Sequence, residues 1–198
     1  LSKIWLGRDL RFGHAREGDA EDLIRWGSEL GFGVGIVEPI LVEGKRISSS
    51  RIRQLIEQGR VDEVQPMLGR YHFISGTVVS GHRRGRSMGF PTANLAATTE
   101  LLPQDGIYAT ILELQDQGWL SVSSVGHNPT FGEGSRTIEA HILDFAKDIY
   151  GEPVKLSFVQ RIREERMFGQ IEDLVTQMHE DLQAARAIFD QLNLGCKN

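Results

Sequence analysis

The chain has 198 residues, 40% hydrophobic and 25% charged, which is an ordinary globular composition with room for one large or two small domains. Its formal net charge of −5 argues against nucleic acid as a partner, and no apolar run is long enough to span a membrane, so no membrane partner is expected. The single cysteine, Cys196, cannot form an intrachain disulfide and indicates a reducing, cytoplasmic compartment.

Residues 1–68 have the pattern of a partial α/β domain. A short strand is expected over Lys3–Leu6, a helix from Asp19 to Gly31, and a buried strand over 33–41. About sixty residues are too few for a complete parallel sheet. We therefore expect apolar side chains of this sheet to be exposed unless other chain covers them, namely Ile4, Leu6, Val34 and Ile36.

Three serines, Ser48, Ser49 and Ser50, open the next predicted helix, which carries Arg53 and runs to Gly59. Hydroxyl and free N–H groups at a helix N-terminus, with a guanidinium beside them, form a candidate anion site. The alternative is simple N-capping, and the spacing alone favours that alternative. A short second helix is expected over 61–68, and the domain boundary is expected at Gly69.

From Tyr71 the pattern changes to short strands separated by turn signals, which indicates an antiparallel barrel. The apolar side chains after residue 170 fall at helical spacing, so the chain is expected to end in one long amphipathic helix that packs on the barrel. The fold class is therefore mainly β. The expected strands are Tyr71–Val79, Gly106–Leu114, Trp119–Val125, Thr137–Leu143 and Val154–Ile162.

The stretch Gly89-Phe90-Pro91-Thr92-Ala93-Asn94 presents small oxygen donors after a rigid turn. Pro91 fixes its own φ and favours an extended conformation for the residue before it. In an extended segment Thr92 and Asn94 point to one face, and their hydroxyl and amide oxygens suit a Mg²⁺ ion that shares its coordination with substrate phosphates. An ordinary surface loop leading into a strand is the alternative.

A basic run interrupted by glycines precedes this turn. It offers free backbone N–H groups and guanidinium groups, which are the groups that bind a polyphosphate. Together with the turn it makes a candidate site for a polyphosphate, whose residues are Gly81, Arg83, Gly85, Arg86, Pro91, Thr92 and Asn94.

Glu139 lies in a predicted strand whose faces alternate, with His141 on the same face. A lone glutamate in such a strand is most often at the surface. The functional alternative is a general base that accepts a hydroxyl proton during phosphoryl transfer. For His141 we expect a structural or solvent-facing role.

Two further stretches are candidates for a ligand site. The loop from Ser124 to Gly132 is punctuated by glycine and proline, so it is either a cover for a flat ligand or a set of plain turns. The charged run around Arg163 would ordinarily be a solvated face. Arg163, however, falls at a predicted strand end, where the barrel loops gather.

Several motifs of the chain, taken in order, resemble the riboflavin kinase family over residues 69–190. They are Gly-x-Pro-Thr-Ala-Asn at 89–94, Asp105-Gly106-Ile107-Tyr108-Ala109, the Gly126–Gly132 loop, Glu139 in Thr-Ile-Glu-Ala-His-Ile-Leu-Asp-Phe, Tyr150-Gly151, and Arg163-x-Glu165-x-Met167-Phe168. The upstream stretches Gly7–Gly13 and Ile47–Arg53 resemble the end of the FMN adenylyltransferase module that precedes the kinase in bacterial bifunctional enzymes.

The resemblance implies ATP-dependent phosphorylation of riboflavin to FMN by a six-stranded barrel with a C-terminal helix. Glu139 would be the catalytic base, and Thr92 and Asn94 would hold Mg²⁺. The flavin side would be formed by Asn128, Thr130, Phe131, Arg163 and Phe168. The rival hypothesis is a non-catalytic flavin- or nucleotide-binding module.

For residues 1–68 the resemblance implies the C-terminal part of an adenylyltransferase that converts FMN to FAD. Ser48, Ser49, Ser50 and Arg53 would be the remnant of its ATP site. The His-x-Gly-His type motif that begins this module does not occur before residue 13, and the first residue is not Met. We therefore expect a piece of a longer protein, with residues 69–198 as the kinase domain, that makes FMN but not FAD. The sequence indicates no oligomeric state.

Overall fold

The computed structural model describes residues 2–81, 85, 88–97, 101–127 and 136–195. The chain forms two compact units, Leu1–Ser48 and Ser49–Asn198. Within the described ranges, no helix is both long and apolar enough to cross a membrane.

The first unit is built on one parallel strand pair. Strands β1 (Lys3–Gly7) and β2 (Gly33–Val37) pair in parallel, and helix α1 (Ala20–Leu30) connects them. Asp19 caps this helix through a capping box with Asp22, and Gly31 ends it at a φ of 76°. The predicted strand–helix–strand pattern and both predicted helix ends are thus confirmed. The second strand was predicted as buried over 33–41, which was wrong, because it ends at Val37 and none of its residues is buried. The unit also contains η1 (His14–Arg16), β3 (Leu41–Val42) and β4 (Lys45–Arg46).

The exposed apolar surface of this small sheet lies on the face that carries Trp5, whereas it was predicted on the face that carries Leu6. Leu6 is only 6% exposed, and α1 approaches the same face, since a Cβ atom on Gly27 would lie 3.0 Å from Val34 Cγ2. Trp5, on the other face, is 64% exposed. The expectation that Leu6 is exposed was therefore wrong, because the crossover helix covers its side of the two strands.

The second unit begins with helical segments that pack on the barrel. These segments are α2 (Ser49–Glu57), η2 (Asp62–Val64) and α3 (Gln65–Leu68). At the end of α2 the backbone passes close to the barrel: a Cβ atom on Gly59 would lie 2.8 Å from Arg161 Cδ and 2.9 Å from the Tyr108 hydroxyl. Residues 49–68 therefore belong to the same compact unit as the barrel, because they contact it. The domain boundary after residue 68 stays a prediction.

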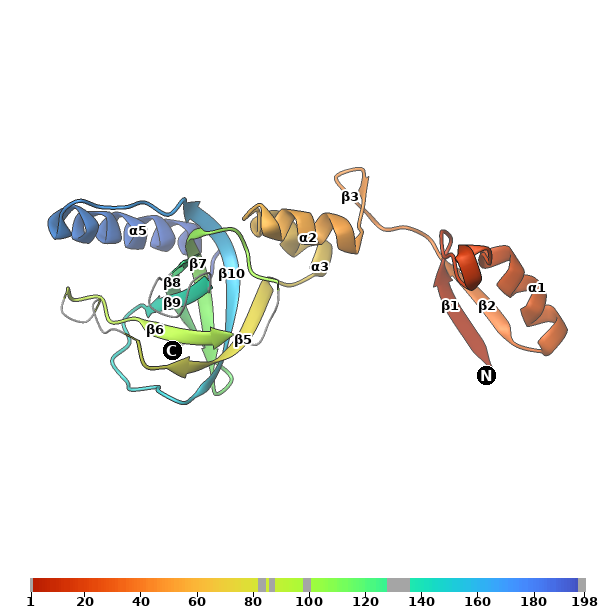
Figure 1. The fold of residues 1–198 in the computed structure, drawn as a ribbon, viewed down its shortest axis with the longest axis horizontal. Coiled ribbons are helices and arrows are strands. Elements are labelled where there is room, and N and C mark those ends of the chain that lie inside the picture. Colours follow the sequence, from red (N-terminus) through yellow and green to blue (C-terminus); the bar gives the residue numbers. More distant parts are fainter. Residues whose placement is uncertain (1, 82–84, 86–87, 98–100, 128–135, 196–198) are drawn as a thin grey trace. The chain divides into compact units, whose positions relative to one another are not determined.

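Six of the described strands form a closed antiparallel barrel in the order β10-β5-β6-β9-β8-β7 (Figure 1). β10 pairs with both β5 and β7, which closes the barrel. This architecture confirms the predicted mainly β fold. The strands are β5 (His72–Val79), β6 (Ala93–Ala97), β7 (Gly106–Leu114), β8 (Gln117–His127), β9 (Arg136–Ile142) and β10 (Pro153–Arg163).

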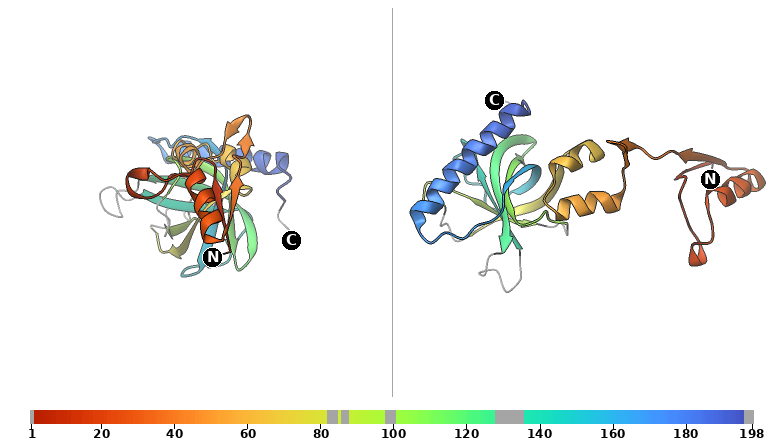
Figure 2. Two further views of the ribbon diagram at one scale, coloured as in Figure 1. Left: turned by 90° about the vertical axis from the view of Figure 1, so that its right-hand side faces the viewer. Right: turned by 90° about the horizontal axis from the view of Figure 1, so that it is seen from above.

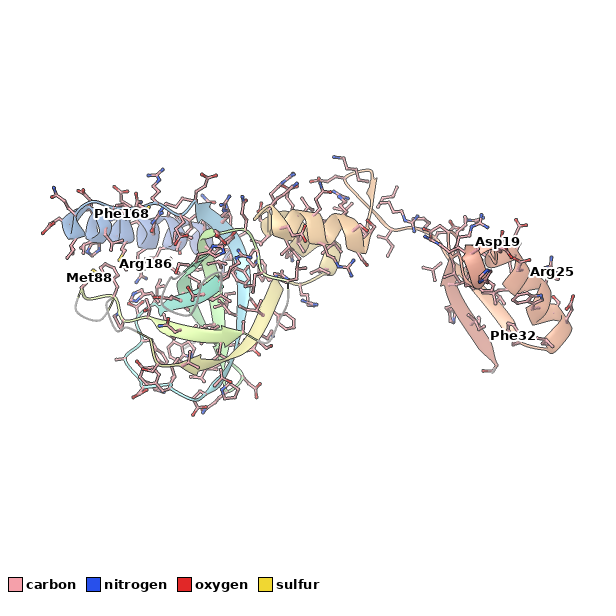
Figure 3. The ribbon with its side chains drawn as sticks, viewed as in Figure 1. Asp19, Arg25, Phe32, Met88, Phe168 and Arg186 are labelled. Carbon is pink, nitrogen blue, oxygen red and sulfur yellow. The ribbon has the colours of Figure 1, made fainter. Side chains whose placement is uncertain are left out.

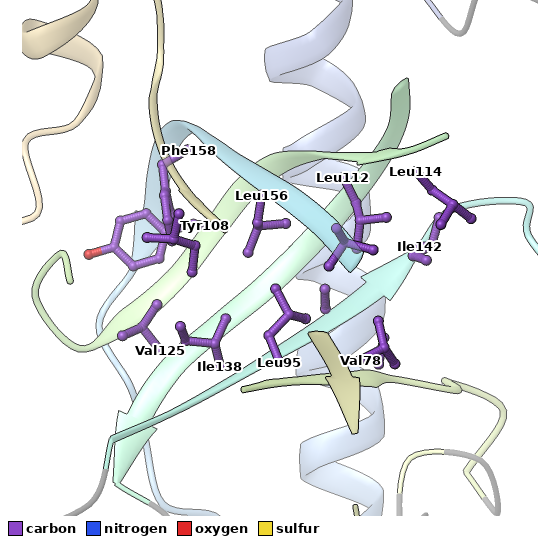
Figure 4. Close-up of a cluster of buried hydrophobic side chains, with 14 of the residues drawn as sticks. Val78, Leu95, Tyr108, Leu112, Leu114, Val125, Ile138, Ile142, Leu156 and Phe158 are labelled. Atoms are coloured by element: carbon purple, nitrogen blue, oxygen red, sulfur yellow. The ribbon is translucent and has the colours of Figure 1, made fainter. Parts of the chain in front are cut away.

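Alternate residues of these strands fill the barrel interior, as the strand period of two requires (Figure 4). Tyr108, Leu112, Leu156 and Phe158 are fully buried there, and Ile138 fills the same core. The residues between these positions consequently point to the outside of the barrel wall.

Helix α5 (Ile171–Gln191) covers part of the outer face of the barrel (Figures 1 and 2). Its Ala185 and Phe189 are buried against Ala109 and Val159, whose side chains point to the outside of the barrel. The predicted packing of a long amphipathic helix on the barrel is confirmed. The outer face beneath and beside this helix holds the candidate site.

Candidate active site

A row of side chains crosses the outer face of the barrel wall through direct cross-strand pairs. In this row Asn94 pairs with Glu139, Glu139 with Ser124, Ser124 with Ile107, and Ile107 with Arg163. Directly paired residues of antiparallel strands project from the same face of a sheet. The ladder therefore brings the predicted metal ligand Asn94, the predicted base Glu139 and Arg163 to one face, although they are far apart in the sequence.

Thr92 lies directly beside the carboxylate of Glu139. Its Oγ1 donates a hydrogen bond to Glu139 Oε2 at 3.2 Å. Because the hydroxyl proton points to the carboxylate, the oxygen lone pairs stay available to a cation. The predicted base and a predicted metal ligand thus form one hydrogen-bonded pair.

Asn94 is buried beneath the backbone of Gly81. A Cβ atom on Gly81 would lie 2.2 Å from Asn94 Nδ2 and 2.8 Å from its Oδ1. Only glycine lets the chain pass so close to the amide. Gly81 therefore belongs to this site through its contact with Asn94.

His141 fixes the rigid turn that carries Thr92. Its Nδ1 donates to the carbonyl oxygen of Pro91 at 2.8 Å, and its ring packs edge-on against Phe90 at 5.5 Å. The ring of Phe90 also packs edge-on against His179 of α5, at 5.0 Å. Phe90 is buried and contacts both imidazoles, so the turn is fastened to both β9 and α5.

A cavity of about 220 Å³ lies between this face and α5. Its polar lining includes Thr92, Ser124 and Glu139 and the charged residues Arg163, Glu165, Arg166 and Asp181. Its apolar wall comes from the stretch before α5 and from the helix itself, and includes Phe168, Leu174, Met178 and Leu182. Phe168 precedes the first turn of the helix (Figure 3). The cavity therefore combines polar and apolar groups, as small-molecule sites commonly do.

A second cavity, of about 470 Å³, also borders the turn. It is lined by Pro91, Thr92 and Ile142 and by the connection between β9 and β10, from Phe145 to Tyr150. Thr92 lines both cavities. The two cavities therefore share Thr92 in their linings, and Glu139, its hydrogen-bond partner, lines the smaller one.

Glu165 is a second carboxylate in the lining of the smaller cavity. Its pKa is raised, mainly by burial and also by the nearby charge of Asp105. A Cβ atom on Gly126 would lie 2.5 Å from both of its carboxylate oxygens. The side-chain position of Glu165 therefore depends on a glycine at 126.

The riboflavin kinase family model matches residues 68–189, the part of the chain that contains this barrel and both cavities. The chain belongs to the riboflavin kinase family. The FAD synthetase model matches residues 1–51. The two matches follow the order that the motifs indicated.

Curated relatives have the same two activities in their names. A bifunctional riboflavin kinase/FMN adenylyltransferase from Pseudomonas fluorescens is 35% identical over 189 residues, which are 95% of this chain and 61% of that protein. The enzyme of the same name from Listeria monocytogenes is 36% identical over 194 residues, which are 97% of this chain and 62% of the Listeria protein. The chain thus spans about three fifths of the length of these relatives.

A solved structure also resembles the chain. It is described as that of a macrolide-efflux protein from Streptococcus pneumoniae, and it is 39% identical with a TM-score of 0.83. The match covers 91% of this chain and 58% of that one.

Several predicted site residues of this riboflavin kinase family member lie outside the described residues. These are Arg83 and Arg86 of the basic run, and Asn128, Thr130 and Phe131 of the predicted flavin loop. Gly85 is described, and its carbonyl oxygen accepts hydrogen bonds from the backbone N–H groups of Phe90 at 2.8 Å and Met88 at 3.1 Å. The end of the basic run is thus bonded to the start of the rigid turn.

The predicted adenylyltransferase remnant lies away from this row of residues in the chain. Ser48 is the last residue of the first unit. Ser49 and Ser50 begin α2, and Arg53 follows one turn later. Their assignment to an ATP site stays a prediction.

Sequence reasoning named Arg163, Phe168 and the start of the final helix for the flavin side, and Arg163, Phe168 and Leu174 line the smaller cavity. It missed the Phe145–Ile149 segment of the larger cavity and, further along α5, Met178 and Leu182 of the smaller one. The helical stripe did contain a signal, because Leu174, Met178 and Leu182 lie within one helical face at i, i+4 and i+8. That stripe continues beyond the part of α5 that packs on the barrel core.

The oxygen donors of the site fit a magnesium ion. Thr92 and Asn94 offer neutral oxygens next to one carboxylate, and such a set requires further oxygens from substrate phosphates to complete a magnesium shell. No cluster of three or more histidine, cysteine or acidic side chains with metal-binding geometry occurs among the described residues. A metal here would therefore need further oxygen ligands from outside the protein.

Proposed function

We propose that the barrel unit transfers the γ-phosphoryl group of ATP to the ribityl 5′-hydroxyl of riboflavin, which gives FMN and ADP. The observation that carries this proposal is the position of Thr92, which lines both cavities and donates to Glu139. Family membership names the reaction class, and the curated relatives carry the substrate in their names.

In this proposal the smaller cavity takes the flavin, and the larger one takes the nucleotide. Glu139 accepts the proton of the 5′-hydroxyl as that oxygen attacks the γ-phosphorus. The bond between the γ-phosphorus and the bridging oxygen breaks, and ADP leaves. Phosphoryl transfer requires little covalent chemistry from the protein. The main contribution of the protein is therefore to hold the two substrates in line at Thr92.

Magnesium would be held by Thr92 and Asn94 together with the nucleotide. When bound, the ion neutralises charge on the phosphate oxygens. The chain's own part is to present two oxygens and to keep Asn94 in place beneath Gly81. Backbone N–H groups and guanidinium groups of the run from Gly81 to Arg86 would bind the phosphates, as proposed from the sequence.

The flavin side is proposed to combine Phe168 and the α5 wall with the loop residues Asn128, Thr130 and Phe131. Tyr150 and Phe145 line the larger cavity and are proposed to lie beside the nucleotide. The rival, a non-catalytic flavin- or nucleotide-binding module, requires no carboxylate beside the residue that the two cavities share. The hydrogen bond from that residue, Thr92, to Glu139 favours catalysis.

We further propose that residues 1–68 belong to a module of the kind that adenylylates FMN to FAD, as the names of the relatives suggest. Ser48, Ser49, Ser50 and Arg53 would line part of its ATP site. Residues 69–198 would be the riboflavin kinase domain. A cytoplasmic location remains the expectation from the single cysteine.

The test is an assay of the purified chain with riboflavin, ATP and Mg²⁺. FMN and ADP should appear in equal amounts, and omission of Mg²⁺ should abolish both. Binding of both substrates without turnover would support the non-catalytic module instead. The same assay with FMN in place of riboflavin should give no FAD. FAD made at a rate comparable to FMN would contradict the expectation that this part of the chain lacks a complete adenylyltransferase site.

A further inference from the structure

Arg163 and Asp181 form a bidentate ion pair between the end of β10 and the middle of α5. Arg163 Nε donates to Asp181 Oδ1 at 2.7 Å, and Nη2 donates to Oδ2 at 2.7 Å. The two side chains are only 13% and 6% exposed. Parallel, charge-assisted hydrogen bonds of this kind fix direction as well as distance.

Neighbouring groups complete the hydrogen bonding of the pair. Gln177 Nε2 donates to Asp181 Oδ1 at 3.2 Å, and Arg163 Nη1 donates to the carbonyl oxygen of Glu164 at 2.8 Å. The Phe168 ring lies beside the guanidinium, with 5.9 Å between the ring centroid and Arg163 Cζ. Arg163 and Asp181 both also line the smaller cavity, so the predicted contact of Arg163 with the flavin stays a prediction beside these protein contacts.

The segment between the two partners forms one wall of the smaller cavity. Glu165, Phe168, Leu174 and Met178 all line that cavity, and all lie between residues 163 and 181 in the chain. The ion pair joins the two ends of this segment. Closing a loop restricts the conformations open to everything within it, so the pair restricts the wall.

We propose that the Arg163–Asp181 pair is a clasp that holds the wall of the smaller cavity in its binding position and so sets the affinity for the flavin. Both are positioning residues in this proposal, and neither takes part in phosphoryl transfer. The identity of the occupant rests on the proposed function. The restriction of the cavity wall by the clasp does not depend on the proposed function.

A second ion pair on the same helix provides a matched comparison. Arg186 of α5 (Figure 3) pairs with Asp144 at 3.1 Å, and these side chains are 55% and 74% exposed. Neither of them lines either cavity. Exposed pairs contribute little, whereas loss of one partner of a buried pair leaves a charge uncompensated. A comparison of the two pairs therefore distinguishes the effect of losing any ion pair of α5 from the effect of losing the clasp at the cavity.

The experiment compares Asp181→Asn with Asp144→Asn, an identical change at the two pairs. In Asp181→Asn the KM for riboflavin should rise about tenfold or more, the scale expected when a charge-assisted hydrogen bond is lost. The kcat at saturating riboflavin and the KM for ATP should stay within about threefold, since the clasp touches neither Glu139 nor the larger cavity. Asp144→Asn should leave all three values unchanged.

Arg163→Lys provides a second variant if Asp181→Asn does not fold. Lysine keeps the charge but cannot make two parallel hydrogen bonds, so a smaller rise in the same KM is expected. An unchanged KM for riboflavin in both variants would overturn the clasp. An equal loss of kcat and of affinity for both substrates would also overturn it, because general destabilisation would then explain the result.

Hydrogen exchange of the ligand-free chain separates failure of the clasp from failure of the proposed function. Residues 164–180 should exchange faster in Asp181→Asn than in wild type and Asp144→Asn. Unchanged exchange in this segment would refute the clasp, whatever the substrate. Absence of FMN formation by the wild-type chain would refute the proposed function, and the exchange measurement would still decide whether the clasp holds the wall.

Discussion

Asn94 and Glu139 are direct partners in the β6–β9 ladder, so their side chains leave the barrel wall from the same face. The distance between them is set by strand pairing, and a one-residue slip would send one of the two into the barrel interior. The proposed metal ligand and the proposed base are therefore held by rigid elements. Such placement suits phosphoryl transfer, in which positioning provides most of the rate.

Replacing Glu139 by Gln should lower kcat for FMN formation by about 10²–10⁴-fold, the typical contribution of a general base. The amide keeps the size of the side chain and can still accept from Thr92, so the KM values for riboflavin and ATP should change little. Steady-state kinetics with riboflavin and Mg-ATP measure all three.

Glu113→Gln is the matched control for this change. Glu113 is also a strand glutamate, and its Oε2 pairs with Lys155 Nζ at 3.0 Å, away from both cavities. Wild-type kcat is expected in this variant. A Glu139→Gln enzyme that retains turnover within a few-fold of wild type would rule out Glu139 as the base.

Thr92→Val and Asn94→Leu should each raise the Mg²⁺ concentration needed for half-maximal activity. Each change keeps the approximate volume and removes one oxygen from the proposed coordination shell. Titration of activity with Mg²⁺ at fixed ATP gives the half-saturation value. Thr77→Val, at an exposed position of β5, should not alter it. The metal assignment fails if the two site variants titrate like this control.

The sequence predicted most strands because their apolar alternation matches the barrel wall. The exception is β6, Ala93–Ala97, which is too short and too rich in alanine to stand out as a strand run. The resemblance to the family supplied the sixth strand, which a periodicity argument did not. The boundaries were closest where turn residues stand at both ends, as in β7, Gly106–Leu114.

The candidate site was predictable only in part, since sequence shows which face a residue occupies but not what covers that face. The hydroxyl, amide and carboxylate of Thr92, Asn94 and Glu139 were selected from pattern and resemblance. The role of His141 depends on a carbonyl oxygen fifty positions away in the chain. The engagement of Arg163 by Asp181 depends on how α5 docks. Neither relationship leaves a local signal.

Gly81→Ala should weaken Mg-ATP binding without unfolding the barrel. The added Cβ would lie 2.2 Å from Asn94 Nδ2, a distance that forces either the amide or the backbone to move. Displacement of the Asn94 oxygen should raise both the Mg²⁺ half-saturation value and the KM for ATP, each measurable by the same titrations. The KM for riboflavin should be unchanged.

Gly118→Ala is the control for the loss of a glycine from the barrel. A Cβ atom there would meet Ile111 Cγ2 at 3.4 Å, an ordinary contact, and the site is remote from Asn94. Near-wild-type kinetics are expected. If Gly81→Ala behaves in the same way, the close approach of Gly81 to Asn94 has no part in metal or nucleotide binding.

His72 should make the stability of the barrel unit depend on pH. Its ring is buried beside Phe158, at a centroid distance of 5.9 Å, and Nε2 donates to the carbonyl oxygen of Leu101 at 3.2 Å. Burial lowers the pKa of His72, and the charge of Arg70 lowers it further, against the opposing effect of the Leu101 hydrogen bond. His72 therefore has a lower pKa in the folded chain than in the unfolded chain, where its pKa is that of an ordinary histidine.

The sign of the effect follows from this difference. The unfolded state binds more protons once the pH falls below the ordinary histidine value of about 6.5, so the free energy of unfolding should decrease as the pH falls through and below that value. One proton limits the slope to about 1.4 kcal/mol per pH unit. His72→Gln keeps an N–H donor for Leu101 and cannot take up the proton. Urea unfolding at several pH values between 7.5 and 5.5 should therefore show a smaller acid loss in this variant than in wild type, and parallel curves would refute the assignment to His72.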